Sequence, residues 1–444
     1  MRSSPTRLPR VLRPFALRQY RWLAAGLALA LFGDGVWLIA LVWQVIGLGG
    51  GPGVVSLVSG VAAVGMIVAT LFGGVLADRV SQRKIIVGLE TVKLIAFASV
   101  GIASLLGVLS YPHLVGAALL GGITTGMYYP AYSALLPRVV EAAQLQAANG
   151  VEGFMRPVLF QAAGPMIAGA VIGAASPGAA IIVGAVACVG SGACYLAMSP
   201  IPRTDAVAGE DAPAAAREAG HPVRDILADL GEGFAYMWRT PWLWASLFYV
   251  SFLLLMVMGP IEVLVPFALR DRAGGDASDH ALVLAAFGAG AAIGAFIFAS
   301  IPMPRRYLSV MFALWTVCSV PMVIMGFAER TIWFVVAGFL IGLMLDGPMV
   351  LWGTLLQRRV PTELLGRISG LDFFVSAAFM PVSMALAAPV SHWIGLGATF
   401  AVAGLLPVPA AIVFYLSARL WRDEIAHPLR VPEIEVPLPG ASSR

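Results

Sequence analysis

The sequence predicts an all-α polytopic membrane protein with 12 transmembrane helices in two pseudo-symmetric halves of six. Of its 444 residues, 59% are hydrophobic and only 12% are charged, about half the charged share of soluble domains. Apolar runs of about 20 residues recur along the chain, where a soluble α/β protein would alternate short apolar strands with polar helices. Weak matches between the two halves of the sequence complete the argument.

Twelve apolar runs are long enough to cross a bilayer. They are expected at 21–47, 54–77, 85–109, 114–136, 149–173, 178–199, 242–268, 281–300, 307–327, 332–355, 367–391 and 396–420. The one extended polar segment lies between the sixth and the seventh. The chain is therefore divided into an N-terminal arm (1–20), a first half (21–199), a linker (200–240), a second half (241–420) and a tail (421–444).

Arginines gather on one side of this predicted bundle. They occur in the arm, the linker, the tail and four connecting loops, whereas the loops of the other side hold only Arg270, Arg272 and Arg330. Basic loops stay in the cytoplasm, so both termini are expected there. Only two of the 28 basic residues are lysines, which, with the abundant alanine and glycine, is typical of a GC-rich bacterial genome. We therefore expect a multi-pass protein of the bacterial inner membrane.

The second part of the linker is expected to lie on the membrane surface. Over 223–238, apolar residues that include Leu230, Phe234 and Met237 recur at helical spacing. This pattern predicts an amphipathic helix in contact with the lipid bilayer.

Several classes of function are excluded by the sequence. The five histidines are scattered and show no metal-ligand spacing. A Gly-rich loop ending in Lys-Ser/Thr, which would bind ATP phosphates, does not occur. The net charge of +4 comes from arginines at helix ends, so it does not indicate nucleic-acid binding. We expect no enzymatic activity, no cofactor, no metal and no nucleic-acid partner.

Four pairs of short matches relate the halves at offsets of 218 to 222 residues. They are Trp22-Leu23 with Trp242-Leu243, Arg83-Lys84 with Arg305-Arg306, Pro130 with Pro348, and Asn149-Gly150-Val151-Glu152 with Ser369-Gly370-Leu371-Asp372. Their conserved order and nearly constant offset indicate a duplication into two parallel halves.

A charged hairpin joins the second and third predicted spans. It reads Gly74-x-Leu76-Ala77-Asp78-Arg79 followed by Arg83-Lys84, and it resembles the signature loop between helices two and three of the major facilitator superfamily. In that family the loop is a cytoplasmic latch that holds the outward-facing state. The resemblance implies a gating role for Gly74, Asp78, Arg79, Arg83 and Lys84, with contacts near Gly366-Arg367. A plain positively charged anchor is the alternative.

Other segments resemble one branch of that family. The loops Pro137-Arg138-Val139-Val140-Glu141 and 358–367, and Gly33-Asp34 in the first span, are similar to those of drug:proton antiporters that export macrolides, tetracycline or enterobactin. The resemblance implies the major facilitator fold and export by proton exchange. The arginine associated with proton coupling in span four of many such antiporters is absent here.

Charged residues within the apolar runs are the candidate coupling residues. A charge at mid-bilayer costs about 2.5–3.5 kcal/mol and needs a partner, a proton or a wet cavity. Asp34, between two glycines, is interpreted as an isolated carboxylate that can take up and release a proton or bind a cationic substrate, with a structural hydrogen bond between helices as the alternative. Asp346 and Asp372 have the same interpretation, as does Glu262, which follows the helix-bending Pro260 and could instead face an outer vestibule.

Two further sets of charges can neutralise themselves within one helix. Glu152 and Arg156 are one turn apart, and so are Glu90 and Lys93. For these residues a structural ion pair is the alternative to a coupling role.

The sequence therefore predicts a monomeric secondary transporter that exports small amphiphilic drugs or antibiotics in exchange for protons by alternating access. A siderophore or lysophospholipid transporter of the same fold, and a non-transporting receptor or assembly protein, remain the alternatives.

Overall fold

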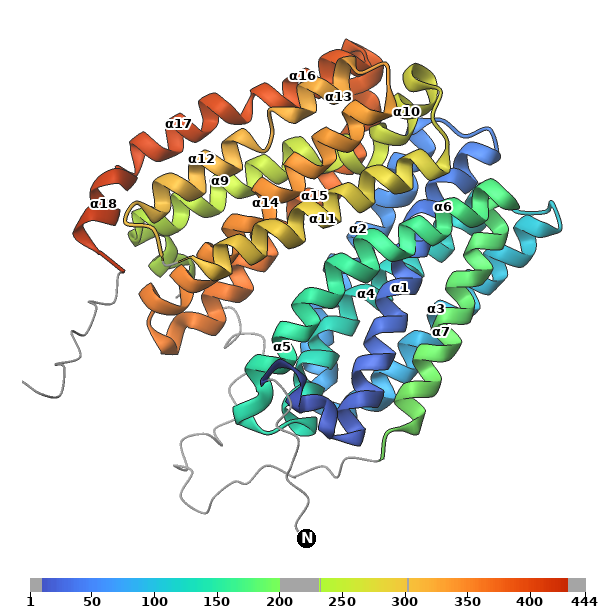
Figure 1. The fold of residues 1–444 in the computed structure, drawn as a ribbon, viewed down its shortest axis with the longest axis horizontal. Helices are drawn as coiled ribbons and strands as arrows, with labels where there is room; N and C mark the ends of the chain where they lie inside the picture. The colour runs from blue at the N-terminus through green and yellow to red at the C-terminus, as the bar shows by residue number, and fades with distance from the viewer. Residues whose placement is uncertain (1–9, 200–230, 232, 302, 430–444) are drawn as a thin grey trace, which may run out of the picture.

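The computed structural model describes the chain except for residues 1–9, 200–230, 232, 302 and 430–444, and all regular elements that it describes are helices (Figure 1). The side chains of 10–12, 71–79 and 299, and of some residues within 142–150 and 362–377, are also outside the description. Both the first part of the predicted amphipathic helix and most of the linker thus fall outside the described residues.

The first half starts with a short 3₁₀ helix, η1 (Arg10–Ala16), followed by four long helices. These are α1 (Arg18–Gly47), α2 (Pro52–Arg79), α3 (Gln82–Leu105) and α4 (Tyr111–Val139). Three consecutive segments form the next long helix: α5 (Ala142–Met155), the π-helical η2 (Arg156–Ala163) and α6 (Gly164–Ala174). Helix α7 (Pro177–Ala197) completes the first half.

The helices of the second half are interrupted more often. The first consists of α9 (Pro241–Gly259), the π-helical η4 (Pro260–Leu264) and α10 (Val265–Ala273), and is followed by α11 (Ala277–Ser300), α12 (Tyr307–Val317) and α13 (Pro321–Phe327). The chain continues through α14 (Thr331–Arg359), α15 (Thr362–Ile394), α16 (Leu396–Leu405), α17 (Pro407–Ser417) and α18 (Leu420–Ala426).

Ten helical stretches of the described chain are long and apolar enough to cross a membrane. The predicted spans 114–136 and 367–391 are not among them. Glycines, tyrosines and a proline make α4 less apolar. In α15 the described side chains form a shorter apolar stretch, Ala378–Ile394, because several side chains before it lie outside the described residues. The protein is a multi-pass membrane protein, whereas the count of 12 and the boundaries of the two halves stay predictions.

Local signals explain where several helices begin and end. Ser176 accepts a hydrogen bond from the Ala179 amide before α7, as an N-cap residue does. Before α11, Asp276 and Asp279 form a reciprocal capping box. Gly274 ends α10 with a φ of 65°, a backbone conformation that glycine adopts without steric cost.

Glycines allow the closest helix contacts in each half. A Cβ added to Gly122 of α4 would lie 1.9 Å from the carbonyl oxygen of Ala62 in α2, and one added to Gly342 of α14 would lie 2.0 Å from that of Phe287 in α11. Small residues at such crossings let membrane helices pack backbone to backbone. The two glycines are 220 residues apart, within the offset range of the predicted repeat.

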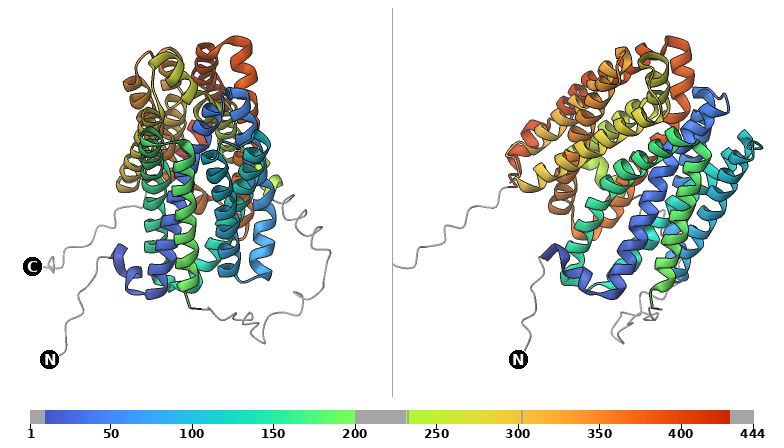
Figure 2. Two further views of the ribbon diagram at one scale, coloured as in Figure 1. Left: turned by 90° about the vertical axis from the view of Figure 1, so that its right-hand side faces the viewer. Right: turned by 45° about the vertical axis from the view of Figure 1, so that its right-hand side comes forward.

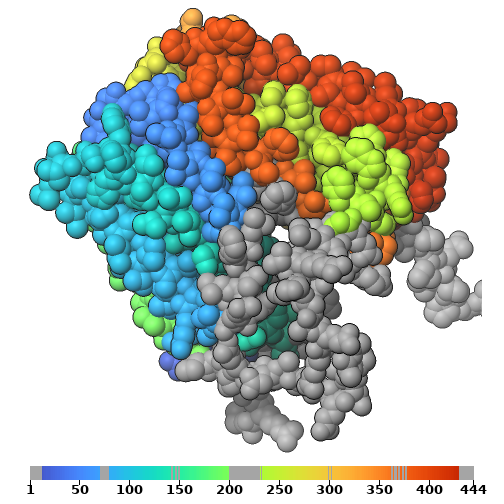
Figure 3. Space-filling model, turned by 180° about the vertical axis from the view of Figure 1, so that it is seen from behind, coloured from blue at the N-terminus to red at the C-terminus, as the bar shows by residue number. Residues whose placement is uncertain are grey.

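The two groups of helices, α1–α7 and α9–α18, lie side by side and both begin at the end of the bundle where the N-terminus lies (Figure 1, Figure 2). They meet through α6 and η2 against α11 and through α2 against α15, and the second of these seams is visible from behind in Figure 3. Near the opposite end, Trp43 Nε1 donates to His280 Nδ1 at 3.3 Å and Ser278 Oγ donates to the Gly169 carbonyl at 3.3 Å. The halves are thus joined at the end remote from the termini.

Candidate functional site

A cavity of about 230 Å³ lies between the two halves. Its lining comes from α1, η2, α9, η4, α11 and α14, and is apolar apart from three side chains: Gln161, Glu262 and Asp346. The other lining residues are Leu38, Phe160, Leu254, Met258, Ile261, Leu284, Phe287, Leu345 and Met349. An apolar cavity with a few convergent polar groups is the usual form of a small-molecule site.

Two π-helical segments supply much of this lining. η2 follows directly on Met155 and contains Pro157, and η4 begins with Pro260. A proline within a helix removes one backbone donor and clashes with the preceding turn, and wider π turns recur at functional sites. The helix expected to be disturbed at Pro260 changes there from α-helix to π-helix. The π segment in the fifth predicted span was missed, although Pro157 was its signal.

Glu262 and Asp346 are brought together in this cavity from distant parts of the sequence. In the described part of the chain, neither carboxylate has a hydrogen-bond or ion-pair partner, and the buried Oε1 of Gln161 has none either. A carboxylate in apolar surroundings is costly unless it binds a proton or a cation. The cavity therefore suits a cationic group of a ligand.

A second acidic cluster lies within the first half. Lys93 Nζ is 2.8 Å from Asp34 Oδ1 and 3.4 Å from Glu90 Oε1, and the side chains of Lys93 and Glu90 are 2% and 1% exposed. The interpretation of Asp34 as an isolated carboxylate is thus wrong: Lys93, expected to pair within α3, also bridges to α1. One ammonium and two carboxylates give the cluster a net charge of −1, so binding one proton makes it neutral.

Helix α1 connects this cluster with the cavity. Asp34 and the cavity-lining Leu38 are one helical turn apart, so they lie on the same face of the helix. Asp34 is also the most accessible member of the cluster, with 22% of its side chain exposed. Sequence reasoning could not find the cluster, since Asp34 and Lys93 are 59 residues apart.

Three other predicted residues lie in separate contacts. Glu152 and Arg156 approach to 3.8 Å, which confirms that they can pair, and Arg156 is half exposed. Asp372 was expected to be one of the freer carboxylates, but its Oδ2 accepts a hydrogen bond of 3.0 Å from Trp352 Nε1. Neither set lines the cavity between the halves.

The predicted gating loop is described only in part. Arg83 donates from Nε and Nη2 to the carbonyls of Tyr195 and Leu196, at 2.7 and 2.6 Å. It therefore holds the end of α7, where unpaired carbonyls favour a cation. Lys84 is exposed. The surroundings of Gly74 and Gly366 and the side chains of Asp78, Arg79 and Arg367 lie outside the description.

Apolar helices in two groups around a central cavity are typical of a membrane transporter for small substrates. The family model of the Major Facilitator Superfamily matches residues 23–378. The chain belongs to the major facilitator superfamily.

Relatives within the family include exporters. The chain is 25% identical over 411 residues to the multidrug efflux pump Tap of Mycolicibacterium fortuitum, covering 89% of this chain and 94% of Tap. It is 28% identical over 309 residues to the enterobactin exporter EntS of Shigella boydii, covering 69% of each. The crystal structure of the nucleoside transporter NupG has the same fold, with a TM-score of 0.67 at 11% identity over 91% of this chain and 99% of NupG.

Proposed function

We propose that the protein exports small amphiphilic cations across the bacterial inner membrane in exchange for protons. It would work as a monomer by alternating access, with both termini in the cytoplasm. The observation that carries this proposal is the apolar cavity between the halves. Its lining includes Glu262 and Asp346, which have no hydrogen-bond or ion-pair partner among the described residues. The similarity to Tap and EntS supports export as the direction.

The carboxylates favour a cationic substrate over an acidic one. A lipophilic cation would place its charge near Glu262 or Asp346 and its apolar body against residues such as Phe160, Phe287 and Met258. An acidic siderophore would bring further negative charge to this lining, in which no basic residue occurs. Charge-assisted contacts of this kind are worth about 1.5–3 kcal/mol, or about 10- to 150-fold in affinity.

Proton coupling is assigned to the cluster of Asp34, Lys93 and Glu90. One bound proton makes the cluster neutral, whereas its loss leaves an uncompensated negative charge between apolar helices, which is costly. Because Asp34 lies one helical turn from the cavity-lining Leu38, a cation in the cavity would stabilise the deprotonated cluster, and a proton on the cluster would disfavour the cation. Mutual exclusion of this kind couples the two movements.

Alternating access requires that the halves separate where they now meet. The contacts of Trp43 with His280 and of Ser278 with Gly169 hold the end remote from the termini. In the opposite state these bonds would break and contacts of the gating loop would form, as the resemblance to the family implies. Asp78, Arg79 and Arg83 would take part on the cytoplasmic side.

The test is transport by the purified protein in proteoliposomes with an imposed pH gradient. The probes are ethidium, a lipophilic cation, and chloramphenicol, which is neutral. We expect gradient-driven ethidium flux, at least ten-fold reduced in the double variant Glu262→Gln/Asp346→Asn and unchanged in Glu329→Gln, which removes an exposed carboxylate of the same half. Asp34→Asn should retain ethidium binding but lose the dependence on the gradient.

Two results would overturn the proposal. Flux of ethidium that is equal in the double variant and in Glu329→Gln would show that the cavity carboxylates do not recognise the cation. If no gradient drives either probe, the receptor or assembly role is favoured.

A further inference from the structure

A second pocket, of about 550 Å³, lies in the second half at the end of the bundle that carries the termini. It is bounded by the start of α9, the end of α14 and the segment from α18 to Leu429. Three arginines line it, Arg239, Arg358 and Arg359, together with Trp242, Asp423 and His427. It shares no lining residue with the cavity between the halves, so transport as proposed above does not account for it.

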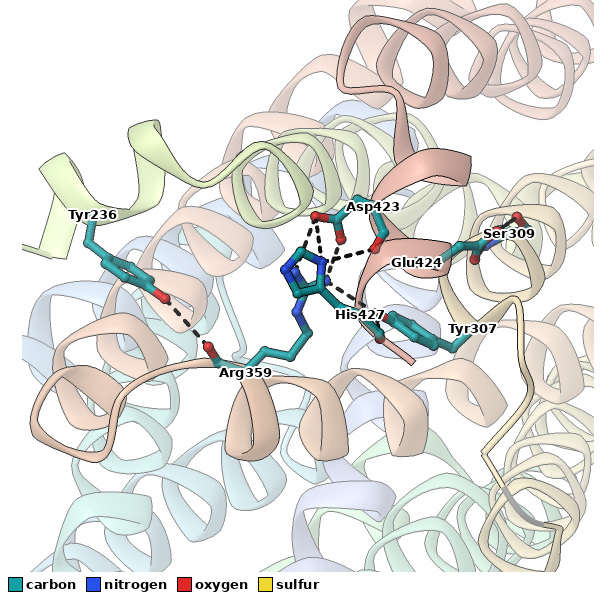
Figure 4. A network of polar contacts seen from close by, with 7 residues as sticks. All are labelled: Tyr236, Tyr307, Ser309, Arg359, Asp423, Glu424 and His427. Carbon is teal, nitrogen blue, oxygen red and sulfur yellow. Dashed lines mark hydrogen bonds and ion pairs between the residues drawn. The ribbon is translucent and has the colours of Figure 1, made fainter. Parts of the chain in front are cut away.

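One of the three arginines is already neutralised. Arg359 forms a bidentate ion pair with Asp423, and its guanidinium lies 4.8 Å from the centre of the Trp242 ring. Figure 4 shows this side chain directed from α14 toward Asp423 and His427 of the C-terminal segment. The pair therefore forms a fixed wall of the pocket.

The other two arginines leave positive charge in excess. Arg358 Nη1 donates to the carbonyl of Leu429 at 2.9 Å, a neutral acceptor, and Arg239 has no ion pair within the described part of the chain. Both are exposed. Guanidinium groups present several donors in a fixed plane, a geometry that suits phosphate oxygens.

An exposed aromatic strip continues from this basic pocket. Phe234 and Trp238, which are one helical turn apart and precede Arg239, are 49% and 61% exposed and stack with ring centres 6.2 Å apart. Trp238 in turn lies 6.2 Å from the rings of Trp244 and Phe248 on α9. Aromatic rings of this kind are typical of the level at which lipid headgroups meet acyl chains.

We infer that this pocket binds the headgroup of an anionic phospholipid, such as phosphatidylglycerol. Arg239 and Arg358 hold the phosphate, and the acyl chains lie along the strip of Phe234, Trp238, Trp244 and Phe248. Basic pockets between transmembrane helices are known to take such headgroups. The aromatic strip favours a lipid over a free phosphate ion, because a soluble anion would gain nothing from it.

The site joins three segments that are distant in sequence. A bound headgroup would bridge Arg239, which precedes α9, and Arg358 at the end of α14, beside the Arg359–Asp423 pair that holds α18. Binding should therefore stabilise this end of the second half.

The experiment measures lipid binding directly and needs no transport. The purified protein is titrated in neutral detergent with phosphatidylglycerol or with phosphatidylcholine of the same chains, and retained lipid is counted by native mass spectrometry. The variants are Arg239→Gln/Arg358→Gln and, as control, Arg305→Gln/Arg306→Gln, which removes two exposed arginines before α12. Each guanidinium near a lipid headgroup contributes about five-fold in affinity, so the pocket variant should bind phosphatidylglycerol about 30-fold more weakly and the control should be unchanged.

Three results would overturn the inference. Equal retention of the two lipids would show that headgroup charge is not recognised. Equal loss in both double variants would reduce the effect to general surface charge. Competition of soluble glycerol phosphate at the same concentration as the lipid would identify a free phosphate compound as the ligand instead.

Discussion

The buried cluster around Lys93 makes the sharpest prediction for stability. Lys93→Met keeps the length of the side chain but removes the only cation within reach of Asp34 and Glu90 among the described residues. Removing one partner of a buried ion pair typically costs about 3–5 kcal/mol, because the remaining charge stays buried without compensation. Here two carboxylates are left, so we expect a loss in that range.

The melting temperature provides the assay. A loss of 1 kcal/mol lowers the melting temperature of a unit of 150–250 residues by about 2–4 °C, so Lys93→Met should melt about 6–20 °C below the parent protein. The chain reports its own unfolding, because Cys188, Cys194 and Cys318 are free and buried. A thiol-reactive dye in detergent will label them as the helices separate.

A matched control and a rescue decide between explanations. Lys84, the other lysine of the chain, is exposed on the same helix, and Lys84→Met should leave the melting temperature within about 2 °C. The triple variant Asp34→Asn/Glu90→Gln/Lys93→Met removes all three charges and should regain most of the lost stability. If Lys93→Met melts like Lys84→Met, or if the triple variant is no more stable than Lys93→Met, the argument from charge balance is refuted.

Two further predictions concern packing and the end of the second half. Gly122→Leu should prevent folding or lower the melting temperature by more than 10 °C, because its Cβ would overlap the backbone of Ala62. Gly116→Leu on the same helix has open space and should be tolerated. Equal melting temperatures of the two variants would contradict the close crossing of α2 and α4. Arg359→Gln should speed proteolysis of the C-terminal segment, because Asp423 then loses its bidentate arginine partner in a mostly buried ion pair and, among the described residues, keeps only the contact with His427. Limited proteolysis followed by mass spectrometry will show whether cleavage after α18 rises or stays as in the parent protein.

The sequence by itself determined the class of fold and some of the places where its helices are interrupted. Apolar runs of bilayer length predict membrane helices because the hydrocarbon core offers no partner for backbone groups other than those of a helix or a barrel. Pro260 predicted the interruption of the seventh span, since a proline removes a backbone donor wherever it occurs. These are local rules, and a local pattern is enough to apply them.

Only the tertiary structure decided which charges meet. Asp34 looked isolated because its partner Lys93 comes from another helix, and Asp372 looked free although Trp352 binds it. Glu262 and Asp346 appeared as separate candidates, yet they line one cavity. A buried charge is stabilised by whatever lies within a few ångströms of it, and for residues on different helices that distance is set by the packing of the bundle, which the spacing of residues along one helix does not record.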